Sequence, residues 1–321
     1  MNRVSLPAQE DGTLPWGLGL DVGGTKIAGG IVDLGSGELL ARRVIPTAPE
    51  RSGEVVLADA LAMAKKLMAE AHALGGKVES IGVGVAELVD ADGNICSSHL
   101  LGWGRLPVRD RFARIAPAVV EADVRAAALG EARYGAGREF STFIYVTVGT
   151  GISSCLVQDG RPFAGARGNA LVLASAPLSS ICPHCGARHD QILEEYASGP
   201  AIATRFSRRA NRAVARAEEV MAAAAIGDRD AVEIVHSAGE ALGNSVGFLV
   251  NVPDPEAVVV RRAGARWGAL LGQFRRFDTG THLERGNADA SYLEGGAQHR
   301  QRTGGRRVPG LGTADGTIGL V

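Results

Sequence analysis

A short glycine-rich stretch near the start of the chain carries the residue types that bind phosphate. In LDVGGTK, Gly23 and Gly24 have no Cβ, so a ligand can approach their backbone closely. Successive amide N–H groups in such a turn can form a concavity for phosphate oxygens, with Thr25 and Lys26 as further donors. The carboxylate of Asp21 is placed to hold a hydrated Mg²⁺ beside those oxygens. The stretch predicts a phosphate-binding turn; the alternative is a β-hairpin with an ordinary glycine turn.

A second stretch repeats this theme in the middle of the chain. FIYVTVGTGISSCLVQDG reads as an apolar strand, the turn Gly149-Thr150-Gly151, and a second strand. Neither stretch has the GxxxxGK[ST] spacing of a Walker A loop. Two strand–glycine–strand units suggest two related lobes, each with one phosphate-binding hairpin. The alternative for the second turn is again a purely structural one.

Composition limits the class of protein. The chain has 321 residues, of which 45% are hydrophobic and 21% are charged, and this length and balance are typical of a globular protein with two lobes. The net charge of −1 predicts no general attraction to nucleic acid or to an anionic membrane. No long apolar run opens the chain, so we expect neither a signal peptide nor a transmembrane helix. Four cysteines fit reduced thiols in a cytoplasmic protein.

The elements that must position these turns follow an alternating pattern. Apolar residues at helical spacing predict a long helix over 54–75, and apolar runs predict buried strands at 80–90 and 116–123. The pattern is helical from 190 to 251, and a further buried strand follows at 254–260. Strand, crossover helix and strand indicate a largely parallel sheet with helices on its faces.

Several motifs in a fixed order resemble the ROK family of sugar kinases and repressors, within the actin-like ATPase superfamily. They are LDVGGTK, GVGV with a following LVD, VRAAALGE after an aspartate, VGTG, LEEYASG and LVNVPDPEAVVV, and they run from about Gly17 to Val260. The resemblance implies an α/β protein with the two-lobed actin-like ATPase (ribonuclease-H-like) fold, a central mixed sheet in each lobe, and binding of ATP and a sugar. The family's repressors carry a helix-turn-helix segment before the first phosphate loop. Only about 17 residues precede that loop here, which favours the kinase branch.

On this basis the expected organisation has four parts. Residues 1–16 are a flexible tail, 17–120 an N-terminal α/β lobe, 121–260 a C-terminal α/β lobe, and 261–321 an atypical tail rich in Arg and Gly.

The resemblance also assigns the catalytic group. Phosphoryl transfer from ATP with Mg²⁺ benefits from a carboxylate that accepts the proton of the sugar hydroxyl, and Asp123 matches the family's base, in contact with the sugar. It follows a strand and precedes a helix, where α/β folds present functional groups; its alternative role is that of an N-cap. Glu194 matches a family carboxylate that hydrogen-bonds the sugar, and the alternative is a solvated helix face beside Glu195. The two glycine turns then bind the phosphates of ATP.

Departures from the family pattern cluster on the sugar side. A pocket built to hydrogen-bond hydroxyls loses affinity and discrimination when its polar partners become apolar. The changed positions are Ala86-Glu87 in place of Pro-Gly, Leu100 and Ala122 in place of Asn, and Leu171 to Ser175 in place of a Gly-Glu-x-Gly-His segment. They predict a less hydroxylated or differently decorated substrate, or loss of activity.

A short cysteine-containing segment raises the question of zinc. The family binds structural zinc with a His and three Cys; this chain has CPHCGARHD, in which Cys182, Cys185 and His189 are candidate ligands. Ser175 stands at the family's His position, so the set is one ligand short of the usual four. The alternative is a loop with two reduced cysteines.

After Val260 the chain no longer follows the family. The residues beyond it are rich in Arg and Gly and have little apolar periodicity, which is typical of a disordered or divergent C-terminus. The preferred hypothesis is a reading-frame slip near codon 260, because Val-Arg-Arg-Ala-Gly can be encoded so that loss of one base yields Val-Gly-Gly-Leu, close to the family's glycine turn.

The sequence therefore predicts a cytoplasmic, ATP- and Mg²⁺-dependent carbohydrate kinase that acts on a small-molecule sugar. Nucleic acid and membrane are not expected as partners, and the resemblance makes a homodimer plausible. The alternative is a catalytically weak or inactive sugar-binding or regulatory protein on the same fold.

Overall fold

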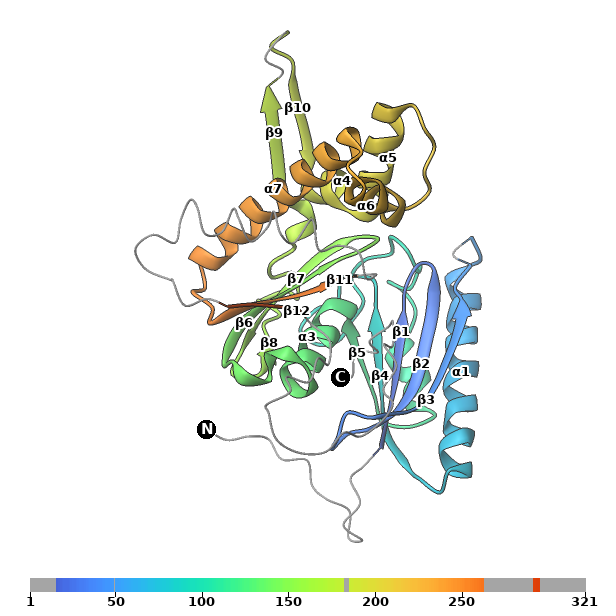
Figure 1. The fold of residues 1–321 in the computed structure, drawn as a ribbon. Helices are drawn as coiled ribbons and strands as arrows, with labels where there is room; N and C mark the ends of the chain where they lie inside the picture. Colours follow the sequence, from blue (N-terminus) through green and yellow to red (C-terminus); the bar gives the residue numbers. More distant parts are fainter. Residues whose placement is uncertain (1–15, 49, 182–184, 263–290, 295–321) are drawn as a thin grey trace, which may run out of the picture. The chain divides into compact units, whose positions relative to one another are not determined.

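The computed structural model describes residues 16–48, 50–181, 185–262 and 291–294 (Figure 1). Within these ranges no helix is long and apolar enough to cross a membrane. The segments 263–290 and 295–321 lie outside the described residues, and with them lies most of the Arg- and Gly-rich tail.

The chain folds into two compact units. Of the described residues, the first takes in 16–138 and 160–170, and the second takes in 139–159, 171–262 and 291–294. This division falls later than the expected boundary after residue 120, because the helix that begins at Asp123 packs against strands of the first unit.

The first unit is built on a mixed sheet of five strands in the order β3–β2–β1–β4–β5. β1 to β3 are antiparallel neighbours, whereas β4 pairs parallel with both β1 and β5. The expected strand–helix–strand crossover is therefore present between β1–β3 and β4. The elements of this unit are β1 (Trp16–Val22), β2 (Lys26–Asp33), β3 (Leu39–Pro46), α1 (Gly53–Ala73), β4 (Val78–Val85), α2 (Val108–Ala113), β5 (Ala118–Ala122) and α3 (Asp123–Tyr134).

The two faces of this sheet are covered by different helices. Leu20 lies on the face packed by α1, because a Cβ built on the neighbouring Gly29 would lie 2.7 Å from both Leu20 and Met63 of that helix. Successive side chains of a strand point to opposite faces, so Asp21 points away from α1. α3 packs against β4 and β5. The sheet thus separates the apolar core around α1 from the face that carries the candidate site.

The helix α1 forms where the apolar spacing predicts it. Its buried residues recur every three or four positions and make one apolar stripe; they are Val56, Leu57, Ala60, Met63, Ala64, Leu67 and Ala71. The helix ends before Gly75, whose φ of +82° is a conformation that glycine adopts without strain.

Among its described residues, the second unit contains the strands β12, β11, β6 and β7, which are neighbours in that order in one sheet, a two-stranded hairpin and four helices. β6 and β7 are antiparallel and enclose the second glycine turn, while β11 pairs parallel with β6. The elements are β6 (Thr142–Val148), β7 (Ile152–Gln158), β9 (Pro177–Ile181), β10 (Arg188–Ile192), α4 (Leu193–Ala197), α5 (Gly199–Ala210), α6 (Ala217–Ala225), α7 (Arg229–Asn251), β11 (Ala257–Arg262) and β12 (Ser291–Glu294). The short strand β8 (Arg161–Pro162) lies in the segment 160–170 that belongs to the first unit, and short 3₁₀ turns cover Ala136–Glu139 and Leu173–Ser175.

The helical pattern predicted from residue 190 is only partly correct. Residues 190–192 belong to β10, and Ser198 divides the following helical stretch into α4 and α5, because its side chain caps the new helix by accepting a hydrogen bond from the Ala201 N–H at 3.4 Å. The helices α5, α6 and α7 pack with the strands β6, β7 and β11 around one apolar core.

Candidate functional site

The register of three parallel strands places Asp21 and Asp123 on the same face of the first unit. Asp21 pairs with Gly84 of β4, and Gly84 pairs with Glu121 of β5. Paired positions of neighbouring strands share a face. Asp123 follows two residues after Glu121, at the start of α3. A Cβ built on Gly84 would lie 3.7 Å from the Cα of Asp123, so Asp123 lies on the same face as Asp21, and the charge of Asp21 is close enough to raise the pKa of Asp123.

Asp123 is the first residue of α3 and not its N-cap. Ala122 occupies the cap position with extended backbone angles. One carboxylate oxygen of Asp123 accepts a hydrogen bond from the N–H of Val124 at 2.6 Å. The N-cap alternative is therefore wrong, and a carboxylate in the first turn also gains from the positive end of the helix dipole.

The electrostatics of the pair fit a general base. Burial raises the pKa of Asp123, and the nearby Asp21 raises it further, to about 6, against the lowering effect of the Val124 N–H. Asp123 as a whole residue is exposed, although the surrounding protein desolvates its carboxylate. Burial also raises the pKa of Asp21, whereas Lys26 lowers it.

The first glycine turn joins β1 to β2 as the sequence predicts. The Gly23 N–H donates to the Lys26 carbonyl at 3.0 Å, and the hydroxyl of the buried Thr47 donates to the Gly23 carbonyl at 2.6 Å. Neither glycine has a positive φ, and a Cβ on either would make only ordinary contacts of 3.5 Å or more. The described fold itself does not require glycine here. An open cradle that a Cβ would partly fill fits a phosphate ligand.

A buried carboxylate lies beside this turn and was noticed in the sequence only as a departure. Glu87 is 7% exposed. Its carboxylate accepts hydrogen bonds from the Ser97 hydroxyl and from the N–H groups of His99, Leu100 and Leu101, the last three at 2.8 to 3.0 Å. Burial raises the pKa of Glu87, but these bonds together lower it below its usual value. Glu87 therefore fixes the loop 97–101 by hydrogen bonds. This loop lies next to the first glycine turn, because a Cβ placed on Gly24 would contact the side chain of Leu100.

The second glycine turn joins β6 to β7 in the other unit. The Gly149 N–H donates to the Gly151 carbonyl at 2.9 Å, and the Gly199 N–H at the start of α5 donates to the Gly149 carbonyl at 2.8 Å. Glu194 accepts a hydrogen bond from the Ile152 N–H at 2.8 Å. A Cβ on Gly151 would lie 2.6 Å from that carboxylate. A side chain at position 151 would therefore displace the Glu194 carboxylate, which stabilises this turn through its hydrogen bond to Ile152.

The structure thus gives Glu194 a partner that neither sequence interpretation included. Glu194 is half-buried and not fully solvated, and its hydrogen bond to Ile152 places its carboxylate beside the first residue of β7. Contact with a sugar stays a prediction. The segment from Leu171 to Ser175 is a short turn, anchored where the Leu171 carbonyl accepts a hydrogen bond from the Ser154 hydroxyl at 2.8 Å.

The candidate zinc ligands lie in and next to the β9–β10 hairpin. Cys185 is described and exposed, and His189 belongs to β10, whereas Cys182 falls outside the described residues. In the part of the chain that the structure describes, no three His, Cys, Asp or Glu side chains are grouped to hold a metal ion. That search includes neither Cys182 nor the side chain of His189, so zinc binding stays a prediction.

Two charged residues of this site were not assigned a role from the sequence, Glu87 and Arg125. Both are buried, with 7% and 5% of their surface exposed. The sequence contained a hint of their burial, since each of the two charged residues lies among apolar or small residues. Their partners come from distant segments, and no local pattern names them.

The chain is similar to known proteins in sequence and in fold. A family model described as "ROK family" matches residues 17–292. A glucokinase of Streptomyces coelicolor is 31% identical over 254 residues, which cover 78% of this chain and 74% of that protein. Among solved structures, a ROK hexokinase from Thermus thermophilus has a TM-score of 0.70 at 31% identity and covers 88% of this chain and 93% of that chain.

A second solved structure is a ROK family glucokinase from Streptomyces griseus in complex with glucose and AMPPNP. Its TM-score is 0.70 at 27% identity, with 87% of this chain and 94% of that chain covered. These matches confirm the expected fold class, the α/β actin-like ATPase fold with two mixed sheets.

Proposed function

Because this chain belongs to the ROK family, we propose that it transfers the γ-phosphoryl group of ATP to a hydroxyl group of a sugar or sugar derivative. The relatives compared above are sugar kinases. The observation that carries the proposal is the pair of carboxylates on one face beside Gly84, next to a glycine turn that the fold itself does not require.

In this mechanism Asp123 accepts the proton of the attacking hydroxyl. The hydroxyl oxygen forms a bond to the γ-phosphorus while the bond to the oxygen between the β- and γ-phosphorus breaks, and ADP leaves with the electron pair. A pKa of about 6 keeps Asp123 largely ionised at neutral pH, yet close enough to the operating pH to accept a proton effectively. Its exposed surface leaves it accessible to the acceptor.

The phosphate groups are assigned to the two glycine turns. Gly23 and Gly24 offer backbone N–H groups in the first unit, with Thr25 and Lys26 as exposed donors. Gly149, Thr150 and Gly151 form the second turn. Asp21 fits the cation that accompanies ATP, because two carboxylates that repel each other are relieved by a divalent ion with oxygen ligands. When bound, Mg²⁺ would neutralise charge on the phosphate oxygens.

The test is sugar-dependent ADP release, measured with a coupled assay on a panel of hexoses, amino sugars and polyols. Asp123→Asn should lower kcat about 10²- to 10⁴-fold, the range that general base catalysis contributes. Asp110→Asn is the matched control, because this exposed aspartate lies on α2 of the same unit and should leave kcat within about twofold. ADP release that Asp123→Asn leaves unchanged removes Asp123 from the mechanism.

A sugar-binding or regulatory protein without catalysis is the second candidate. The segment from Leu171 to Ser175 favours it, because it offers apolar side chains and one serine where the family's kinases carry a carboxylate and a histidine. Titration calorimetry distinguishes the two. A sugar that binds while no ADP is formed from any compound of the panel selects the second candidate.

Zinc remains a separate proposal on the hairpin of the second unit. If Cys182, Cys185 and His189 hold the ion, metal analysis of the purified protein should find about one equivalent that Cys185→Ser removes. Protein without zinc after growth in zinc-supplemented medium leaves a loop with two reduced cysteines.

A further inference from the structure

A buried arginine lies in the first turn of the helix that begins with Asp123. Arg125 is 5% exposed, and a guanidinium stays charged in proteins, so its burial requires an anion. Glu121 supplies it: Nε of Arg125 donates to Glu121 Oε1 at 2.7 Å, and Nη2 pairs with the same carboxylate. This ion pair spans the junction from β5 to α3, and Asp123 lies between its two members.

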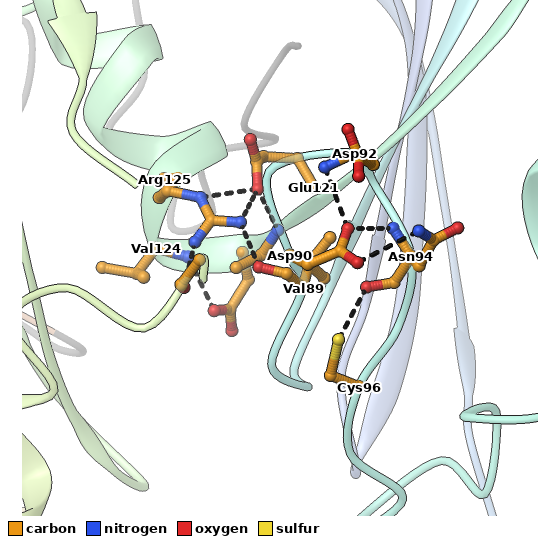
Figure 2. Close-up of polar contacts among 11 residues, drawn as sticks. Val89, Asp90, Asp92, Asn94, Cys96, Glu121, Val124 and Arg125 are labelled. Atoms are coloured by element: carbon orange, nitrogen blue, oxygen red, sulfur yellow. Dashed lines mark hydrogen bonds and ion pairs between the residues drawn. The ribbon is translucent and has the colours of Figure 1, made fainter. Parts of the chain in front are cut away.

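The rest of the guanidinium binds backbone carbonyls from two other segments of the first unit. Nη2 donates to the carbonyl of Val89 at 2.7 Å, and Nη1 donates to the carbonyl of Gly168. Figure 2 shows the guanidinium between Glu121 and the loop that contains Val89. One side chain therefore connects the end of β5, the loop after β4 and the segment 160–170.

The two carbonyl-bearing segments lie directly against each other. Gly168 has a φ of +75°, and a Cβ on it would lie 1.9 Å from the Val89 carbonyl oxygen, so only glycine fits. Beyond Val89 the loop is held by Asp90, whose carboxylate accepts hydrogen bonds from the N–H groups of Asp92 and Asn94 and from the Asn94 side chain, at 2.8 to 3.0 Å (Figure 2). Arg125 joins these two packed segments to α3.

We propose that Arg125 is a positioning residue for Asp123, an inference that rests on the proposed kinase function. The donors of a guanidinium form a rigid planar fork, so binding three acceptors at once fixes where the first turn of α3 begins. The Asp123 carboxylate is bound to the Val124 N–H of that turn and moves with it. A lysine offers one nitrogen on a flexible stem and cannot reproduce the three contacts.

A double-mutant cycle separates this role from a general loss of stability. Arg125→Lys and Arg125→Met should each lower kcat about tenfold or more, since a small misplacement of a catalytic group can cost about 10²-fold, while KM for ATP stays within about twofold. In an Asp123→Asn background the same changes should lower kcat by less than about twofold, because the group being positioned no longer acts as a base. Effects that multiply in the double variants overturn the inference, and so does full activity of Arg125→Lys.

The control is Arg111→Met, which removes another arginine–glutamate pair of the same unit, with Glu54, at a more exposed place. It should leave kcat within about twofold. If Arg125→Met does not fold by circular dichroism, Arg125→Lys and Glu121→Gln carry the same comparison.

A measurement without substrate keeps this inference distinct from the proposed function. Hydrogen exchange of the free protein should be faster in Arg125→Lys for peptides covering 88–92 and 166–170, and unchanged there in Arg111→Met. If the wild type releases no ADP with any sugar, the proposed function fails and the exchange measurement alone decides. Unchanged exchange in Arg125→Lys then overturns the inference.

Discussion

Replacement of Glu87 tests how strongly one buried carboxylate holds the loop beside the first glycine turn. Both carboxylate oxygens are used: Oε1 accepts the N–H groups of Leu100 and Leu101, and Oε2 accepts the Ser97 hydroxyl and the N–H of His99. Because each oxygen accepts two hydrogen bonds, replacement by alanine and replacement by glutamine should lower the free energy of unfolding by different amounts.

Alanine removes all four bonds. Leu101 is 3% exposed, so its N–H is left buried without a partner, at a cost of about 2 kcal/mol. His99 and Leu100 are exposed, so water can replace the carboxylate at their amides, and the remaining bonds add about 1 kcal/mol. We expect Glu87→Ala to lower the free energy of unfolding by about 3 kcal/mol.

Glutamine should cost less, about 1 to 2 kcal/mol. Its carbonyl oxygen can replace Oε1 and keep the bonds to Leu100 and Leu101. Its NH₂ group replaces Oε2 and faces the N–H of His99, a donor opposite a donor, while the Ser97 hydroxyl can rotate to accept.

Acid should reduce the difference between the wild type and Glu87→Gln. The pKa of Glu87 is lower in the folded protein than in the unfolded chain. Its stabilising contribution is therefore fully present above the ordinary glutamate pKa of about 4.3 and is lost as the pH falls through the lower folded value. The difference in free energy of unfolding should narrow below about pH 4.

Urea denaturation followed by tryptophan fluorescence measures these values. Trp103 is fully buried near the end of the same loop, and its indole N–H donates to the Gly53 carbonyl at 2.9 Å. Glu54→Gln is the control, because this glutamate is exposed and should change stability by less than about 1 kcal/mol. Equal losses for Glu87→Ala and Glu87→Gln, or a difference that acid leaves unchanged, would refute the reasoning.

The acid limb of kcat/KM should have an apparent pKa near 6, because Asp123 must be deprotonated to act and burial and Asp21 raise its pKa to about 6; a limb at an ordinary carboxyl value of about 4 contradicts this assignment. Asp123→Asn should raise the melting temperature at neutral pH but not below about pH 4. The reason is that the pKa of Asp123 is higher in the folded protein than in the unfolded chain, so the free energy of unfolding falls as the pH rises from the unfolded pKa to the folded pKa. Equal shifts of the melting temperature at both pH values would contradict this reasoning. Gly151→Ala should cost about 1 kcal/mol in urea denaturation, because its Cβ displaces Glu194 from the Ile152 N–H, and Glu194→Ala should remove most of that cost; additive losses would show that the clash lies elsewhere.

Local patterns in the sequence were sufficient for α1 and for the two glycine turns. The apolar stripe predicted α1, and strand–glycine–strand stretches predicted the hairpins around Gly23 and Gly149. These features depend on residues close in the chain, so periodicity and turn chemistry report them directly. The helix predicted over 190–192 failed because pairing with β9, a tertiary contact of the hairpin, overrode helical spacing.

The tertiary structure alone decided how the charged residues act together. Only the parallel register of β1, β4 and β5 shows that Asp21 and Asp123 lie on one face beside Gly84, where burial and the charge of Asp21 raise the pKa of the candidate base. Burial of Glu87 and Arg125 likewise depends on backbone groups of distant loops, because a backbone donor or acceptor leaves no trace in the residue type that carries it. The sequence determined which residues were available for the chemistry, and long-range packing determined their protonation and their partners.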